Sequence, residues 1–252
     1  MKHGRIFFNG NIVQVTQAAD GRVRLPDGRL LLEADCHWLP PLQAGTVFAL
    51  GLNYADHAAE LAFKAPEVPL VFLKGPNTLI GHRARTRRPQ DATYMHYECE
   101  LAVVIGQTCK NVPKERALDM VAGYTVANDY AIRDYLENYY RPNLRVKNRD
   151  GCTPLGPWLT DAADVPDPQA LRLSTRINGQ TTQQGSTADM VFDVATLIAY
   201  LSSIMTLQPG DVILTGTPEG LADVQAGDVV ETEIEGLGCL INCVVADAEF
   251  FA

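Results

Sequence analysis

Residues 94–106, YMHYECELAVVIG, constrain the fold more than any other part of the chain. Residues 101–105 are all apolar, which is typical of a strand buried on both faces. Glu98 and Glu100 stand two positions apart at the head of this run, so on a strand both carboxylates point to the same side. Carboxylates that enter a buried strand need a partner, because an unpaired buried charge is costly. The pair therefore predicts a site for a hard cation, and two solvated glutamates on a wet strand face are the alternative.

Length and composition indicate one large globular domain with a small appendage. The chain has 252 residues, of which 46% are hydrophobic, enough to bury a sizeable core. No apolar run reaches the roughly 18 residues of a membrane span, and the first residues lack the apolar segment of a signal peptide. We therefore expect a cytoplasmic protein.

Charge and cysteine spacing limit the partners. The formal net charge is −9, which argues against a nucleic-acid partner, and no sequence feature indicates a membrane. The six cysteines include no C-x-x-C pair, so reduced thiols are favoured over disulfides or zinc. A small anionic substrate would have to be held by a metal ion or a local basic cluster.

Turn signals divide the chain near residue 44. Three dipeptides that favour hairpin turns separate short apolar runs at the N-terminus: Asn9-Gly10, Asp20-Gly21 and Asp27-Gly28. The pair Pro40-Pro41 then interrupts the chain. We predict a small β unit over residues 1–44 and a second, larger domain over residues 45–252.

The segment GLNYADHAAE follows a predicted strand at residues 46–50. Asn53 is expected to cap a short helix, on which His57 and Glu60 share one face at spacing i, i+3. A glutamate beside a histidine orients the ring for acid–base chemistry, and an ordinary exposed helix face is the alternative. The next strand, at residues 69–74, ends in Lys74, which is interpreted as a solvated strand end.

A further strand, residues 121–128, ends at Asp129, and residues 130–139 have helical spacing. From the residues alone, Asp129 is best explained as the N-cap of that helix. Downstream, a helix is predicted over residues 190–205 with Asp193 as a possible cap.

Two further groups are candidates for substrate contacts. Arg141, Arg145, Lys147 and Arg149 form a basic cluster, for which a solvated face is the alternative. Residues 215–218, TGTP, follow a predicted strand. There Gly216 allows close approach of the backbone to a ligand, and the Thr217 hydroxyl can donate to a carboxylate. A simple turn explains this segment equally well.

Four segments in this order resemble the fumarylacetoacetate hydrolase family: GLNYADHAAE, YMHYECELAVVIG, VAGYTVANDYAIRD and ILTGTPEG. The resemblance covers residues 45–252 and implies a β-rich α+β fold, the family's mixed β-sandwich roll. It also implies a homodimer, with a sibling subunit as a further possibility. Residues 136–147, LENYYRPNLRVK, are especially similar to the isomerase/decarboxylase branch that acts in bacterial 4-hydroxyphenylacetate breakdown.

The resemblance also implies roles for individual residues. Asp129 joins Glu98 and Glu100 as a metal ligand, and three carboxylates without thiolate or imidazole favour Mg²⁺ or Mn²⁺ over zinc. Lys147 lies near the metal, where it holds a carboxylate or enolate oxygen, and Thr217 lies at the substrate. His57 with Glu60 moves a proton. We further hypothesise that Arg141 and Arg145 contact a distal carboxylate and that Arg133 braces the metal ligands.

One departure bears on the reaction. The branch that cleaves fumarylacetoacetate has a further acidic ligand just ahead of its histidine, whereas residues 51–54 here are GLNY. The resemblance thus implies metal-dependent decarboxylation of 5-oxopent-3-ene-1,2,5-tricarboxylate and isomerisation of 2-hydroxyhepta-2,4-diene-1,7-dioate, in aromatic catabolism. Two alternatives remain open: an acylpyruvate-type C–C hydrolase, and a supporting subunit that needs a sibling chain.

Overall fold

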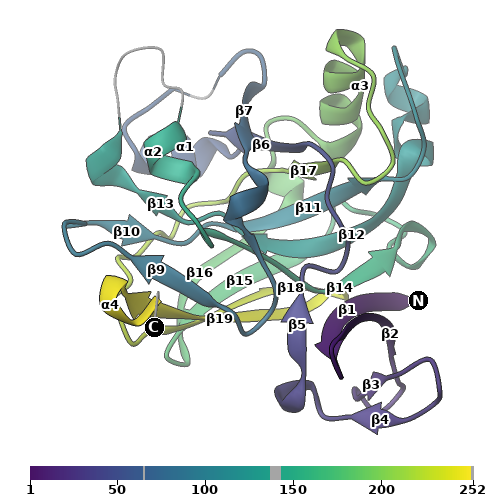
Figure 1. Cartoon of the computed structure of the whole chain (residues 1–252). Helices are drawn as coiled ribbons and strands as arrows, with labels where there is room; N and C mark the ends of the chain where they lie inside the picture. Colours follow the sequence, from purple (N-terminus) through teal and green to yellow (C-terminus); the bar gives the residue numbers. More distant parts are fainter. Residues whose placement is uncertain (65, 137–142, 251–252) are drawn as a thin grey trace.

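The computed structural model describes residues 1–64, 66–136 and 143–250 (Figure 1). Strands make up 42% and helices 19% of the structure, so the predicted β-rich α+β class is confirmed. None of the helices in these three ranges is long and apolar enough to span a bilayer.

The larger of the two main sheets has 12 strands among the described residues. Its main path runs β4, β3, β2, β1, β14, β12, β11, β17, β6, β7, while β5 pairs with β1 and β8 pairs with β14. The strands are β1 (Lys2–Phe8), β2 (Asn11–Gln17), β3 (Val23–Arg24), β4 (Leu30–Leu31), β5 (His37–Leu39), β6 (Val47–Gly51), β7 (Leu70–Lys74), β8 (Leu79–Ile80), β11 (Cys99–Ile105), β12 (Val121–Asn128), β14 (Thr153–Asp161) and β17 (Val212–Leu214).

Two smaller sheets complete the β structure of the described part. The five-stranded sheet has the order β16, β15, β18, β19, β9, and a two-stranded sheet pairs β10 with β13. Their strands are β9 (Arg85–Arg88), β10 (Met95–His96), β13 (Ala131–Ile132), β15 (Arg172–Ile177), β16 (Gln180–Ser186), β18 (Val229–Ile234) and β19 (Gly238–Ala246).

The helices are short. They are α1 (Ala55–Glu60), α2 (Leu144–Lys147), α3 (Val194–Ile204), α4 (Asp247–Phe250) and the 3₁₀ turns η1 (Glu33–Asp35), η2 (Pro76–Thr78), η3 (Lys114–Met120), η4 (Arg133–Tyr135), η5 (Ala162–Asp164) and η6 (Thr187–Asp189). The predicted cap of α3 is confirmed, because the Asp193 carboxylate accepts a hydrogen bond from the Thr196 amide at 2.7 Å.

Strand β11 is buried on both faces along its whole length, as predicted. Leu101 and Val103 on one face pack into the core cluster that contains Leu197 and Ile198 of α3. Ala102 and Val104 on the other face belong to a separate cluster. The alternation of a strand thus divides this apolar run between two cores, and Glu100 lies on the face of Ala102 and Val104.

The N-terminal hairpin turns form as predicted, since β1 to β4 pair in sequence across them. β1 also pairs with β14, Lys2 opposite Thr160, so these strands extend the large sheet. The domain boundary near residue 44 stays a prediction.

Two local predictions are wrong. No helix covers residues 130–136, where β13 is followed by the single turn η4, and the remaining residues of the predicted helix lie outside the described ranges. Asp129 is therefore no helix cap. Asn53 does not cap α1 either: the residue before α1 is Tyr54, and the Asn53 amide bonds instead to the carbonyl oxygens of Phe192 and Thr215. Both side chains are used in contacts with distant segments, which local spacing does not show.

Candidate active site

The candidate site lies at one edge of the large sheet. β11 is antiparallel to β12 and β17, and β17 is parallel to β6. The start of β11 therefore lies at the edge where β12, β17 and β6 end. The segments that carry Glu98, Asp129, Thr217 and His57 all leave the sheet at this edge, which explains why four motifs far apart in the sequence meet.

Strand register brings three carboxylates together. Cys99 pairs with Asn128, so Glu98 and Asp129 lie opposite each other one position further along the strands. Glu100 shares their face and stands opposite Ala127, whose single methyl group leaves space beside the carboxylate. One carboxylate oxygen from each of Glu98, Glu100 and Asp129 lies within 4.8 Å of the other two, and all three residues are buried.

Two lysines supply positive charge to this cluster. The Lys147 ammonium lies 2.6 Å from Glu98 Oε2 and 2.9 Å from Asp129 Oδ2. Lys74, predicted to be a solvated strand end, is buried and contacts Asp129 Oδ1 and the Lys147 carbonyl oxygen. That prediction is wrong because the end of β7 lies against α2 and Asp129 rather than in water. Burial lowers the pKa of Lys74, but the neighbouring acidic groups, led by Asp129, together outweigh burial and raise the pKa above its ordinary value.

Arg133 holds Glu98 from the opposite side. Its Nη2 donates to Glu98 Oε1 at 3.2 Å, and its Nε donates to His96 Nε2 at 2.7 Å. Burial lowers the pKa of His96 to about 3, so the ring is neutral and can accept this bond. The bracing role predicted for Arg133 agrees with these contacts.

The pKa values of Glu98 and Glu100 are shifted in opposite directions. Burial alone would raise the pKa of Glu98, but the neighbouring cations, led by Lys147, hold it well below its usual range. Burial raises the pKa of Glu100 well above its ordinary value, and the negative charges of Asp129 and Glu98 raise it further. Among the described residues, no lysine or arginine forms an ion pair with Glu100, in contrast to Glu98 and Asp129.

His57 is buried on α1, so it does not belong to an exposed helix face. Its Nδ1 lies 3.3 Å from Glu60 Oε2, and Glu60 Oε1 accepts hydrogen bonds from the amides of Gly220 and Leu221 at 3.1 Å each. Because a carboxylate only accepts, the hydrogen of neutral His57 lies on Nδ1. The Nε2 lone pair is then the one available to exchange a proton.

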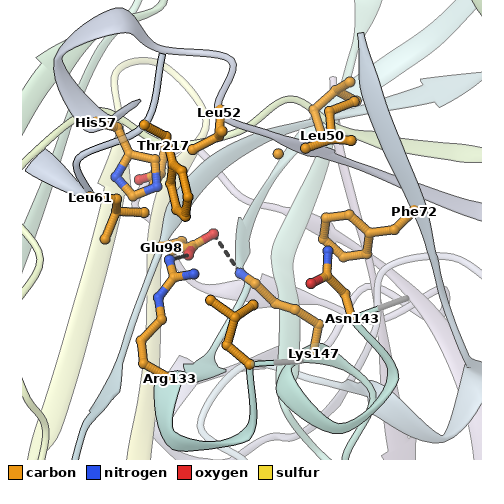
Figure 2. Close-up of a pocket in the computed structure, with 14 residues that line it drawn as sticks. Leu50, Leu52, His57, Leu61, Phe72, Glu98, Arg133, Asn143, Lys147 and Thr217 are labelled. Carbon is orange, nitrogen blue, oxygen red and sulfur yellow. Dashed lines mark hydrogen bonds and ion pairs between the residues drawn. The ribbon is translucent and has the colours of Figure 1, made fainter. Parts of the chain in front are cut away.

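A pocket joins these groups (Figure 2). The polar side chains of Glu98, Arg133, Lys147, Thr217 and His57 line it, and Figure 2 shows Lys147 and Arg133 pointing toward Glu98. Its other walls are largely apolar and consist mainly of Leu50, Leu52, Leu61, Phe63, Leu70, Phe72 and Leu136. The arrangement suits a molecule with an anionic end and an apolar carbon chain.

The TGTP segment follows β17 into the site. The Gly216 amide donates to Glu100 Oε2 at 2.7 Å, and its φ of +87° places it in the left-handed region that favours glycine. A Cβ at this position would lie 2.9 Å from Asn53 Cβ. Gly216 thus supports the carboxylate cluster, while Thr217 lines the pocket. A direct substrate contact for Gly216 stays a prediction.

Of the predicted basic cluster, Lys147 is the member found in the described pocket lining. Arg141 lies outside the described residues. The Arg145 guanidinium lies 4.9 Å from the ring centroid of Tyr135, and that of Arg149 lies 5.0 Å from the same ring. Arg145 is absent from the described pocket lining, so its contact with a distal carboxylate stays a prediction.

Comparison with known proteins agrees with this geometry. The model of the fumarylacetoacetate (FAA) hydrolase C-terminal domain matches residues 46–245. The chain belongs to the fumarylacetoacetate hydrolase family. The family expected from the sequence is thereby confirmed.

Three relatives in this family are informative. The 4-hydroxyphenylacetate degradation bifunctional isomerase/decarboxylase of Salmonella dublin is 61% identical over 208 residues, which cover 82% of this chain and 48% of that protein. The chain thus spans about half the length of this relative. The crystal structure of 5-carboxymethyl-2-hydroxymuconate delta-isomerase from Mycobacterium smegmatis has a TM-score of 0.87 and 40% identity, covering 98% of this chain and 99% of its own. Fumarylpyruvate hydrolase from Pseudomonas aeruginosa, solved with Mn²⁺ and pyruvate, has a TM-score of 0.77 and 32% identity over 82% of this chain and 91% of its own.

The carboxylate cluster fits the divalent ion that this family implies. Glu100 Oε1 and Asp129 Oδ2 are buried without a hydrogen-bond partner among the described residues, although Lys147 forms an ion pair with the latter. Three carboxylates without a thiolate or imidazole form the oxygen-rich set that Mg²⁺ and Mn²⁺ prefer. Glu98, Glu100 and Asp129 are the residues that would hold the ion.

Three polar residues of the site escaped the sequence analysis. Lys74 was assigned to solvent, and His96 and Gln183 were not considered. His96 stands two residues before Glu98 in the sequence, and this proximity to a predicted ligand could have drawn attention to it. No local signal marks Lys74 or Gln183, because the residues of the site that they contact, Asp129 and Thr217, lie at least 34 positions away in the chain.

Proposed function

We propose that the chain is a divalent-metal-dependent enzyme of 2-oxo and 2-hydroxydienoic acids. Its reactions are the decarboxylation of 5-oxopent-3-ene-1,2,5-tricarboxylate and the isomerisation of 2-hydroxyhepta-2,4-diene-1,7-dioate. The observation that carries the proposal is the convergence of Glu98, Glu100 and Asp129 beside a pocket that also contains Lys147 and His57. The names of the relatives that are 61% and 40% identical support the choice of reactions.

Binding follows from the distribution of charge in the pocket. Lys147 and Arg133 offer donors to the anionic end of a 2-oxo acid, and the Thr217 hydroxyl offers another. The apolar wall that includes Leu52 and Phe72 then contacts the unsaturated chain of the substrate. The expected partner is therefore a small organic anion.

When bound, Mg²⁺ or Mn²⁺ supplies Lewis-acid charge that favours the enolate form of a 2-oxo acid. His57 is the group that moves the proton, through Nε2, while Glu60 holds Nδ1 and is itself held by two backbone amides. Lys147 stabilises the negative charge of the enolate oxygen by ion pairing.

The two reactions differ in what leaves the chain. In decarboxylation, the bond to a remote carboxylate breaks, CO₂ departs, and the electron pair passes into the conjugated chain before His57 protonates a carbon. In isomerisation, the hydroxyl proton leaves and His57 returns a proton to a carbon of the diene, so that the double bonds shift without loss of atoms. One proton-transfer group can therefore serve both reactions.

The test is a UV absorbance assay of the purified chain on the tricarboxylate, with CO₂ followed in parallel. The assay is run with Mg²⁺ and then with excess chelator. We expect CO₂ release that requires Mg²⁺ and stops with chelator. A chain that releases no CO₂ in either condition would refute the decarboxylase assignment for this chain alone.

An acylpyruvate-type C–C hydrolase is the second candidate. The fumarylpyruvate hydrolase that is 32% identical favours it, as does the His57–Glu60 pair, which can activate water against a ketone. Release of two organic products without CO₂ would identify this reaction. A third possibility, a supporting subunit, is suggested by the half-length match to the bifunctional relative, and activity of the single chain would exclude it.

A further inference from the structure

Gln183 contacts Thr217, a residue of the pocket lining. It belongs to β16, is only 2% exposed, and has no part in the chemistry described above. Its Nε2 lies 2.9 Å from Thr217 Oγ1 and 2.9 Å from the Pro218 carbonyl oxygen. Its Oε1 accepts a hydrogen bond from the Thr175 hydroxyl at 3.0 Å. Every hydrogen-bonding group of this amide that the structure describes therefore has a partner.

These contacts determine which way the Gln183 amide faces. A carbonyl oxygen can only accept, so the group beside Pro218 must be the NH₂ group. The same NH₂ group then directs its second hydrogen at Thr217 Oγ1. The amide cannot be turned over without setting Oε1 against the Pro218 carbonyl.

The Thr217 hydroxyl has one hydrogen and accepts from Gln183 with one of its lone pairs. Among the described residues, no protein acceptor lies within hydrogen-bonding distance of that hydroxyl hydrogen, and Thr217 lines the pocket. We propose that Gln183 is a positioning residue that orients the Thr217 hydroxyl as a donor to an anionic oxygen of the substrate. The inference rests on the proposed function, since it assumes a 2-oxo acid in this pocket.

Close packing maintains the geometry. A Cβ on Gly185 would lie 2.6 Å from Pro218 Cγ, so the absence of a side chain there lets the segment after β17 press against β16. Gly220, with a φ of +107°, would place a Cβ 3.0 Å from Gln183 Cα. The two glycines thus allow the approach that brings Thr217 within reach of Gln183.

Gln183→Glu reverses the hydrogen bond. A carboxyl group carries at most one hydrogen. The Pro218 carbonyl oxygen can only accept, so that hydrogen is directed at Pro218 rather than at Thr217. Whether protonated or ionised, the new side chain leaves Thr217 to donate toward β16 instead of into the pocket. Thr217→Val removes the hydroxyl at nearly constant shape. Gln184→Glu, on the neighbouring exposed position of the same strand, is the matched control for added charge.

The experiment measures calorimetric binding of pyruvate to the Mn²⁺-loaded chain, for the parent, both single variants and the double variant. A hydrogen bond to a charged group contributes enough that Gln183→Glu and Thr217→Val should each raise Kd about tenfold or more. The double variant should match Thr217→Val to within about twofold, because the lost donor is the same one. Gln184→Glu should leave Kd unchanged, and thermal unfolding reports whether each variant is folded.

Two results would overturn the inference. One is a Kd for pyruvate in Gln183→Glu that equals that of the parent. The other is a Kd in the double variant that is raised by the product of the two factors measured for the single variants, since the two substitutions would then act independently. Turnover assays on the same proteins separate this inference from the proposed reactions. If the chain has no turnover but the two substitutions share one effect on pyruvate binding, the proposed reactions are refuted and the role of Gln183 is supported. If the chain turns over its substrates but the two substitutions act independently on pyruvate binding, the reactions are supported and the role of Gln183 is refuted.

Discussion

Replacing Lys74 by methionine removes a buried cation at nearly constant volume. Its ammonium contacts Asp129 Oδ1 and the Lys147 carbonyl oxygen and lies 3.6 Å from Cys152 Sγ. Breaking a buried ion pair from one side costs about 3–5 kcal/mol, because the remaining charge is left uncompensated. Lys147 still forms an ion pair with Asp129 Oδ2 at 2.9 Å, so we expect the lower end, a loss of about 3 kcal/mol in the free energy of unfolding.

Urea denaturation followed by fluorescence measures this loss, and at an m-value of about 3 kcal/mol/M the midpoint should fall by about 1 M. Lys64→Met is the matched control. Lys64 lies 3.7 Å from Glu67, with side chains 88% and 90% exposed, and removal of so exposed an ion pair should leave the midpoint almost unchanged. If Lys74→Met shifted the midpoint no more than the control, Lys74 would not compensate Asp129 as the structure indicates.

Three other predictions concern the proton-transfer pair, the basic cluster and α3. His57→Asn and Glu60→Gln should lower kcat by about 10²- to 10⁴-fold with little change in KM, and steady-state kinetics that showed only a change in KM would argue against acid–base roles. Arg145→Ala should raise KM if the predicted contact with a distal carboxylate exists, and an unchanged KM would contradict that contact. Asp193→Ala should lower the free energy of unfolding by about 1 kcal/mol. Asp193→Asn keeps an acceptor for the helix amides and should cost much less. Equal losses of the two variants on urea denaturation would contradict capping.

Elements with a strong local pattern could be predicted from the sequence. The two-sided apolar run of β11 and the three N-terminal hairpin turns form as their residues indicate. Asp193 caps α3, although the helix begins at Val194 rather than near Met190. In each case, the interaction that decides the structure lies within a few residues, or follows from the alternation of the strand itself.

Other features depend on contacts that no local pattern shows. Residues 130–136 have helical spacing, but Met95 pairs with Ile132 and His96 with Ala131, so strand pairing prevails there. Lys74 is buried because α2 and Asp129 lie against the end of β7. The meeting of Asp129 with the two glutamates was expected only through the family resemblance, and its physical cause is the register of β11 and β12.

The most direct test of the central claim is a titration of the purified chain with Mn²⁺, followed by the electron paramagnetic resonance signal of the free ion. The chain should bind one Mn²⁺, and Mg²⁺ should compete for it. Glu100→Gln should weaken binding more than about tenfold, while Glu115→Gln, on an exposed position, should have no effect. Equal Mn²⁺ affinity in the parent and in Glu100→Gln would contradict a metal site at Glu98, Glu100 and Asp129.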